Sequence, residues 1–156
     1  MRLISEESLD HGSSVPLCLL TENLPDIKII PLYYSGLDND SHFKFGQLLR
    51  HELLINNEQI AVIASGDLSH RLSKEAPGGY SPRGKKFDKK ITKYLLENKI
   101  QDIINLDENL IIEAGECGLK SILILAGVLD NIKHEPQLLS YEAPFGVGYL
   151  TMNFKL

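Results

Sequence analysis

The feature that most constrains the fold is an apolar run, Ile60 to Ala64, that ends abruptly in the polar segment Ser65-Gly-Asp-Leu-Ser-His70. A continuous β-branched run bounded by glycine predicts a buried strand of a parallel or mixed sheet. Open α/β sheets place their ligand crevice at the carboxyl ends of such strands. Asp67 and His70 are therefore the first candidates for chemistry. The alternative is that Asp67 caps a turn and His70 is a surface imidazole.

The remaining periodicity predicts an α/β fold, a mixed β-sheet flanked by helices. Strands are expected at residues 26–34, 58–64, 138–141 and 147–155, and helices at about 41–54, 87–99, 107–113 and 116–131, with a helical turn at 102–106. A further helix is expected to follow an N-cap at Ser13 or Ser14. Residues 68–86 form one long irregular stretch, and loops of that length are usually functional or mobile.

Composition narrows the class of protein. The chain has 156 residues, enough for a single domain, 1–156, with its own core. A net charge of −5 disfavours a nucleic-acid partner. No apolar run approaches the ~20 residues that span a bilayer, and the N-terminus does not resemble a signal peptide. Cys18 and Cys117 have no motif spacing, which is typical of reduced thiols. We therefore expect a cytoplasmic protein with no membrane partner.

Two kinds of catalytic site are compatible with the titratable residues. His11, His70 and Glu116 are the ligand types of a two-histidine, one-carboxylate iron site, but no two of them share a helical turn. Ser65 and Ser69 near His70 are compatible with a hydrolase, yet the chain has no G-x-S-x-G elbow. The residue spacing alone leaves both interpretations open.

A basic cluster lies in and after the irregular stretch. Gly79 to Lys86 has the glycine and lysine spacing of a P-loop, but Lys86 stands where the Mg²⁺-binding hydroxyl is needed. We therefore do not predict nucleotide binding by a P-loop. The cluster is either a solvated helix face or a lid that attracts an anionic substrate. Its members are Arg83, Lys85, Lys86, Lys89 and Lys90.

A second candidate segment, residues 114–118, opens a strongly apolar helix. Glu116 suits a helix N-terminus because of the helix dipole. Cys117 is either a small packed hydrophobe or, if exposed, a thiol of lowered pKa that can bind a metal or react.

Six ordered motifs together resemble a known family. They resemble the class III extradiol ring-cleavage dioxygenases, and more closely the bacterial branch near the Memo-like proteins. The resemblance extends from about Asp10 to Phe154. The motifs are Asp10-His-Gly with Val15-Pro-Leu, Ser65-Gly-Asp-Leu-Ser-His70, Pro77-Gly-Gly-Tyr-Ser-Pro, Phe87-Asp88, Ala114-Gly-Glu-Cys-Gly118 and Ser140-Tyr-Glu-Ala-Pro-Phe-Gly-Val-Gly-Tyr149.

The resemblance implies an Fe²⁺ site that opens a catechol-type aromatic ring with O₂. His70 is then the catalytic acid/base and His11 a second active-site histidine, neither of them a metal ligand. Glu116 is the carboxylate ligand, and Cys117 is the competing choice. Asp67 orients His70, as carboxylates behind an imidazole do.

The chain departs from the family pattern at its N-terminus. The family's two ligand histidines come from an N-terminal half, upstream of the Asp10-His11 motif. We therefore expect an incomplete extradiol dioxygenase fold, its C-terminal portion, which is inactive alone. The missing half would come from a complementing N-terminal subunit, and exposed sheet surface favours homo-oligomers. The alternative is a non-catalytic Memo-like binding or scaffold protein with a vestigial site, which holds another divalent metal or none.

Overall fold

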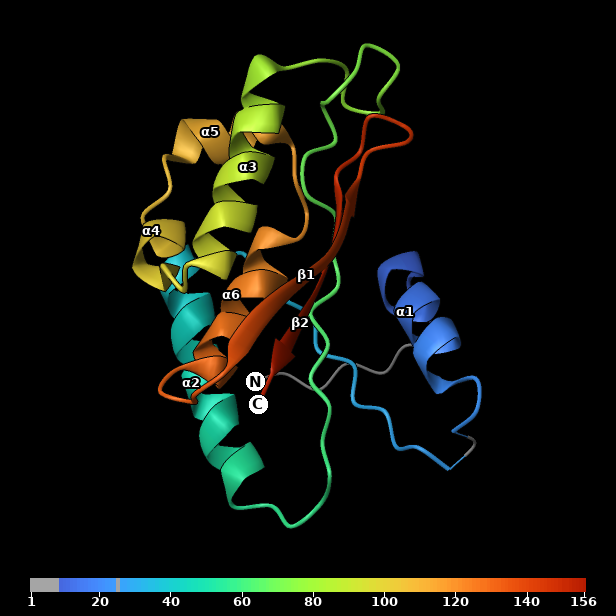
Figure 1. Cartoon of the computed structure of the whole chain (residues 1–156), viewed down its shortest axis with the longest axis vertical. Helices are drawn as coiled ribbons and strands as arrows, with labels where there is room; N and C mark the ends of the chain where they lie inside the picture. The colour runs from blue at the N-terminus through green and yellow to red at the C-terminus, as the bar shows by residue number, and fades with distance from the viewer. Residues whose placement is uncertain (1–8, 25) are drawn as a thin grey trace. The chain divides into compact units, whose positions relative to one another are not determined.

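The computed structural model describes residues 9–24 and 26–156 in two units, Met1–Tyr33 and Tyr34–Leu156 (Figure 1). In the first unit the described residues contain α1 (His11–Thr21). Its N-cap is Asp10, whose carboxylate accepts the Ser13 N–H at 2.8 Å. The predicted cap at Ser13 or Ser14 is therefore wrong: the extended backbone of Asp10 already places an acceptor over the first turn.

The second unit combines helices with a short sheet. The helices are α2 (Asn39–Leu54), α3 (Pro82–Leu96), α4 (Ile100–Ile104), α5 (Glu108–Ala114) and α6 (Leu119–Leu129). Strands β1 (Glu135–Glu142) and β2 (Tyr149–Lys155) pair antiparallel, with an irregularity between Leu138 and Ser140. The α/β class is therefore confirmed.

The two predicted strands at 26–34 and 58–64 are wrong. Both segments lack strand structure, and among the described residues the sheet is two-stranded and antiparallel rather than mixed. A strand needs a neighbour that accepts its backbone hydrogen bonds, and no ladder reaches these segments in the part of the chain described. Ile60, Val62 and Ile63 are consequently exposed.

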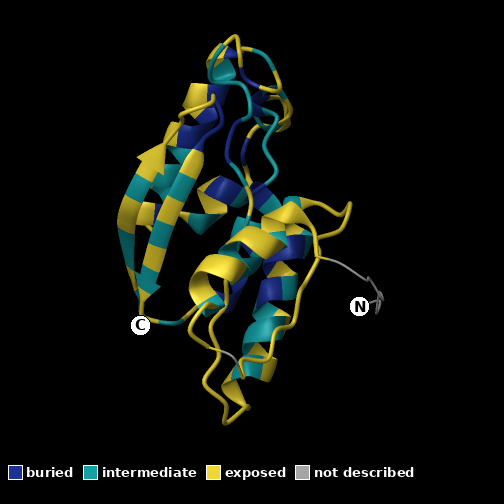
Figure 2. Cartoon of the chain, turned by 90° about the vertical axis from the view of Figure 1, so that its right-hand side faces the viewer, coloured by how far each residue is buried: buried dark blue, intermediate teal, exposed yellow. Residues whose placement is uncertain are grey.

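The core of the second unit forms between α3, α4, α5, α6 and the segment after residue 66. Its buried residues are dark blue in Figure 2. In α3, Phe87 and Ile91 are fully buried, because they recur on one helical face. Ser81 caps α3 through Arg83 N–H, and Pro82 occupies its first turn, where a missing N–H costs nothing. The helix thus begins at residue 82 rather than 87, and the irregular stretch is shorter than predicted.

Helices α2 and α6 lie side by side and meet through two glycines (Figure 1). A Cβ on Gly46 would overlap the backbone of Ile124, and one on Gly127 would overlap the carbonyl of Phe43. The close approach of the two helix backbones therefore requires residues without a side chain at both positions. None of the helices in the described residues is both long and apolar enough to cross a membrane.

Candidate functional site

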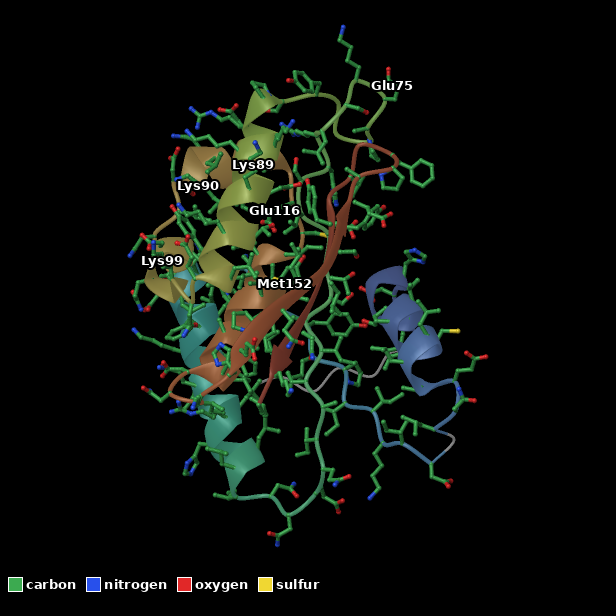
Figure 3. The ribbon with its side chains drawn as sticks, in the orientation of Figure 1. Glu75, Lys89, Lys90, Lys99, Glu116 and Met152 are labelled. Atoms are coloured by element: carbon green, nitrogen blue, oxygen red, sulfur yellow. The ribbon has the colours of Figure 1, made fainter. Side chains whose placement is uncertain are left out.

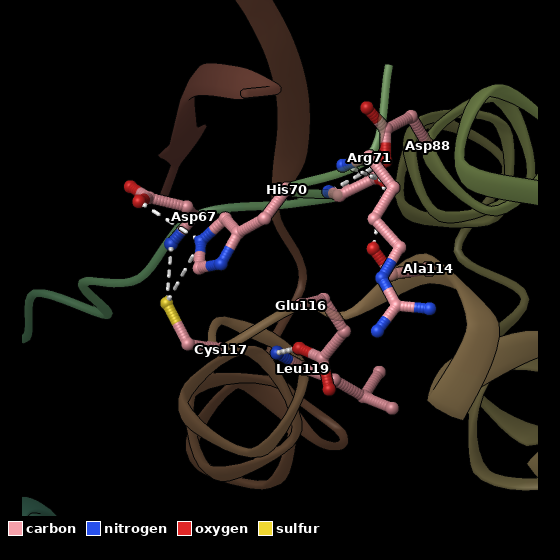
Figure 4. A network of polar contacts seen from close by, with 9 residues as sticks. Asp67, His70, Arg71, Asp88, Ala114, Glu116, Cys117 and Leu119 are labelled. Atoms are coloured by element: carbon pink, nitrogen blue, oxygen red, sulfur yellow. Dashed lines mark hydrogen bonds and ion pairs between the residues drawn. The ribbon is translucent and has the colours of Figure 1, made fainter. Parts of the chain in front are cut away.

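Asp67, His70 and Cys117 converge in the second unit (Figure 4). His70 Nε2 lies 3.2 Å from Asp67 Oδ2 and 3.7 Å from Cys117 Sγ. The Asp67 N–H donates to Cys117 Sγ at 3.2 Å. One ligand atom from each of the three residues lies within 4.8 Å of the others, and all three residues are half-buried. An imidazole, a carboxylate and a thiol at this spacing can share one metal ion or pass a proton between them.

Main-chain contacts hold the two segments of the site together. The Asp67 carbonyl accepts from Cys117 N–H at 3.2 Å and from Gly118 N–H at 2.9 Å. A Cβ on Gly66 would lie 2.5 Å from the Gly118 Cα. The two backbones can approach this closely only because both positions are glycine.

The loop carrying His70 is fixed on both sides. Leu68 N–H donates to the Gly148 carbonyl and Gly148 N–H donates to the Ser69 carbonyl, both at 2.8 Å. His70 N–H and the Ser69 hydroxyl both donate to the Ala114 carbonyl. Backbone hydrogen bonds therefore tie the loop to Gly148, in the connection between β1 and β2, and to Ala114 at the end of α5. Ser69 is fully buried, which argues against a nucleophilic role for its hydroxyl.

Asp88 and Tyr141 are hydrogen-bonded to each other, and Asp88 binds the loop that carries His70. The residue patterns alone did not identify either residue as functional. Asp88 is 1% exposed and accepts from Ser69 N–H at 2.9 Å and from the Tyr141 hydroxyl at 2.6 Å. Burial raises the pKa of Asp88, against the lowering effect of these two hydrogen bonds. Burial and the neighbouring carboxylate raise the pKa of Tyr141 as well. An acid between the apolar stripe positions Phe87 and Ile91 was the signal that could have revealed Asp88.

Glu116 has a structural partner of its own. Its Oε2 accepts the Leu119 N–H at 2.6 Å, at the start of α6. Burial raises the pKa of the Glu116 carboxyl, and hydrogen bonds from Leu119 and Gly118 oppose that shift. Among the described residues, the cluster able to hold a metal consists of Asp67, His70 and Cys117, without Glu116.

The Cys117 thiol differs from the exposed, activated cysteine that the sequence allows. Burial raises its pKa, and the nearby Asp67 and Glu116 carboxylates raise it further, whereas the backbone hydrogen bond from Asp67 lowers it. The side chain is therefore a neutral thiol near pH 7, and a bound metal ion would have to displace its proton.

Within the second unit, Arg71 lies next to the candidate site (Figure 4). Arg71 follows His70, and its Nε is buried with no hydrogen-bond partner in the part of the chain that is described. The residue patterns did not single it out, because nothing around it is periodic. His11 is the first residue of α1 in the other unit, so its convergence with His70 remains a prediction.

The fold and the site define a mixed α/β protein with a cluster of one carboxylate, one imidazole and one thiol that could hold a metal ion. The chain belongs to the family of the catalytic LigB subunit of aromatic ring-opening dioxygenases, whose pattern matches residues 1–152. The resemblance to ring-cleavage dioxygenases is thereby confirmed. Protein CA_C1420 of Clostridium acetobutylicum is 38% identical over 147 residues, which are 94% of this chain. The match covers 31% of that relative, so the chain spans less than a third of its length.

Proposed function

We propose that this chain carries the acid–base part of an extradiol ring-opening site for catechol-type aromatics. The observation that supports the proposal is the contact of His70 Nε2 with the Asp67 carboxylate and the Cys117 thiol, with about a third of the His70 side chain exposed (30%). A partly exposed imidazole can reach a substrate, whereas a buried one cannot. Family membership supplies the aromatic ring-opening chemistry.

His70 is the proposed proton carrier. When Nε2 donates to Asp67, the carboxylate fixes both the tautomer and the ring orientation. Nδ1 is then the nitrogen that can accept the proton of a substrate hydroxyl and return it later. A correctly placed acid/base of this kind contributes roughly 10²–10⁴-fold to the rate. His11 is the proposed second active-site histidine.

We propose that this chain supplies one ligand to a divalent metal ion, Fe²⁺, and that Asp67 and His70 lie beside it. The chemistry that divalent iron supplies in such a site is the transfer of electron density from an aromatic diol to O₂. We take Cys117 rather than Glu116 as the ligand from this chain, because the thiol is in the cluster of ligand atoms with Asp67 and His70, whereas Glu116 is not. Open non-haem iron sites need three protein ligands, so the remaining imidazoles are expected from outside this chain.

The chain covers 31% of its Clostridium relative, and we propose that residues 1–156 act as one domain of a longer cytoplasmic assembly. The domain corresponds to the C-terminal portion of an extradiol dioxygenase fold. A preceding segment or a complementing N-terminal subunit would complete the metal site. The chain alone is then expected to bind Fe²⁺ weakly by calorimetry. Tight, stoichiometric binding that depends on His11 and His70 would contradict the assignment of these two residues as non-ligands.

The direct test uses a chimera in which this chain replaces the matching 147 residues of the Clostridium protein. After anaerobic Fe²⁺ loading, the chimera is expected to consume O₂ when a catechol is added. His70→Ala should abolish this uptake, because no other imidazole lies in the described cluster. His51→Ala is the matched control, since His51 is an exposed residue in the last turn of α2. Uptake that survives His70→Ala would overturn the assigned role.

A second candidate function is a non-catalytic, Memo-like metal-binding or scaffold protein. It is favoured by one observation: His70 Nε2 itself lies within 4.8 Å of the Asp67 and Cys117 ligand atoms, as expected of a ligand. In that case the chimera binds a divalent metal but consumes no O₂ with any catechol. Loss of metal binding in both Cys117→Ser and His70→Ala would then assign the cluster to metal binding alone.

A further inference from the structure

A groove runs along the exposed side of α3, apart from the candidate site. It has a volume of about 470 Å³, and Pro82 and Tyr94 contribute to its lining. Figure 3 marks two of its lysines, Lys89 and Lys90, on this helix. The ammonium groups recur every three or four residues, so they share one helical face. The lysines that line the groove are Lys85, Lys86, Lys89, Lys90 and Lys93.

These charges are almost uncompensated. Lys93 is paired weakly with Glu97 at 3.9 Å, and no ion pair in the described part of the chain reaches the other four. Arg83, on the same helix, differs because it contacts both Asp107 and Glu113 at 3.2 Å. Like charges three and four residues apart on a helix repel one another and destabilise it. A strong local positive potential thus exists in a chain whose net charge is −5.

We propose that this groove binds a compact polyphosphate anion, such as inorganic tripolyphosphate or the triphosphate of a nucleotide. Residues 85 to 93 span about 12 Å along the helix, a length suited to a short phosphate chain. Lysine binds phosphate as a point charge, which requires no P-loop geometry. The groove is open to solvent and lined by α3 alone, so a phosphate chain would lie across the lysine ammonium groups rather than inside a cavity.

Tyr94, the aromatic residue in the lining of the groove, could make a nucleotide bind more tightly than inorganic phosphate. Lys90 Nζ lies 5.8 Å from the centre of the Tyr94 ring, which is partly buried. Lys90 is thus near one part of the ring, and the exposed remainder of the ring is an apolar surface that a base could contact. A long nucleic acid fits less well, because its extended negative charge would meet the acidic remainder of the chain.

The test is a calorimetric titration of the full chain with tripolyphosphate and with ATP, without Mg²⁺. The triple variant Lys85→Gln, Lys89→Gln and Lys93→Gln is expected to bind both at least about tenfold more weakly, because three charged contacts are lost. The matched control neutralises three exposed lysines outside the groove and should bind like the wild type. These are Lys74, Lys133 and Lys155.

Each outcome is decisive. Equal affinity for the two probes assigns the groove to the phosphate chain alone, and tighter ATP binding adds a contact between the base and Tyr94. Replacing the same three lysines by arginine keeps the charge and should preserve binding even if the glutamine variant loses helicity by circular dichroism. The proposal is overturned if neither probe binds, if the glutamine variant binds as tightly as the wild type, or if the control loses as much affinity as the glutamine variant. Neither probe is a catechol, so this result is independent of the ring-opening proposal.

Discussion

At the scale of single residues, Asp88 links the core to the loop that carries His70. Its carboxylate accepts from the Ser69 N–H and from the Tyr141 hydroxyl, and it lies so close to Gly148 that a Cβ there would overlap it. Ser69 directly precedes His70. The position of His70 is therefore set from the buried side of the loop as well as by Asp67.

We predict that Asp88→Asn destabilises the fold by about 1–3 kcal/mol, since the amide can accept only through its oxygen and turns its NH₂ toward a donor. Urea unfolding measures the loss, and faster hydrogen exchange at the Ser69 amide shows that the loop is released. Tyr141→Phe removes one donor and should leave the Ser69 amide protected. Unchanged exchange in Asp88→Asn would show that Asp88 does not position the loop.

The loss of stability caused by Asp88→Asn should depend on pH, because Asp88 titrates and asparagine does not. Burial raises the pKa of Asp88 above its ordinary value of 3.8, so between the two values the folded chain holds a proton that the unfolded chain has lost. The stability associated with Asp88 is therefore largest below the ordinary pKa and falls as the pH rises through the folded-state pKa. The penalty of Asp88→Asn should shrink from about pH 3 toward neutrality. A penalty that grows with pH would contradict this assignment.

Part of the candidate site could be predicted from the sequence. Asp67 and His70 are three residues apart, and a local segment brings their side chains together. Cys117 meets His70 across 47 residues, a contact that spacing alone cannot predict because it depends on how α6 packs. Asp88 and Tyr141 are likewise 53 residues apart. Long-range contacts of this kind follow from tertiary packing rather than from local pattern.

At the scale of elements, the crossing of α2 and α6 depends on two glycines. We predict that Gly127→Ala destabilises the second unit by about 1–3 kcal/mol, because the new methyl group forces the helices apart. Thermal unfolding measures the shift. Gly36→Ala is the matched control, because nothing lies within 4 Å of its Cβ position. Equal melting temperatures for the two variants would contradict close packing at the crossing.

Helices were easier to predict than strands. The predicted helix at 87–99 overlaps most of α3, and the predicted strands at 138–141 and 147–155 overlap β1 and β2. A helix satisfies its backbone within one segment, and a hairpin needs only its neighbour in sequence. The segment at 58–64 forms no helix and has no hairpin neighbour, so a strand partner would have to come from a distant segment. The apolar pattern of residues 58–64 predicted a paired strand, but the segment pairs with no strand in the described residues.

At the scale of the whole molecule, the exposed segment at 58–64 is a candidate surface for self-association. Ile60, Val62 and Ile63 are 46%, 39% and 48% exposed on an extended backbone without a strand partner in the described residues. Such a segment offers both apolar surface and unpaired backbone to a second copy.

We predict concentration-dependent self-association that Val62→Lys reduces, because a charge on the segment opposes strand pairing. Analytical ultracentrifugation over a concentration series measures it. Asn57→Lys adds the same charge at an exposed position outside the apolar run and should associate like the wild type. If both variants are equally monomeric, net charge rather than the apolar segment controls association.

The Asp67 carbonyl accepts two backbone N–H groups, from Cys117 and Gly118. These bonds hold the two segments of the cluster together without using any side chain. The distance between the segment at Asp67 and the segment at Cys117 is therefore set by main-chain amides. Cys117→His or Cys117→Asp would change the donor from sulfur to nitrogen or oxygen and lose the Asp67 N–H bond to Sγ, while the two amide bonds to the Asp67 carbonyl stay in place. If the cluster holds a metal ion, this one position is therefore where its preference among iron, zinc and copper would be changed.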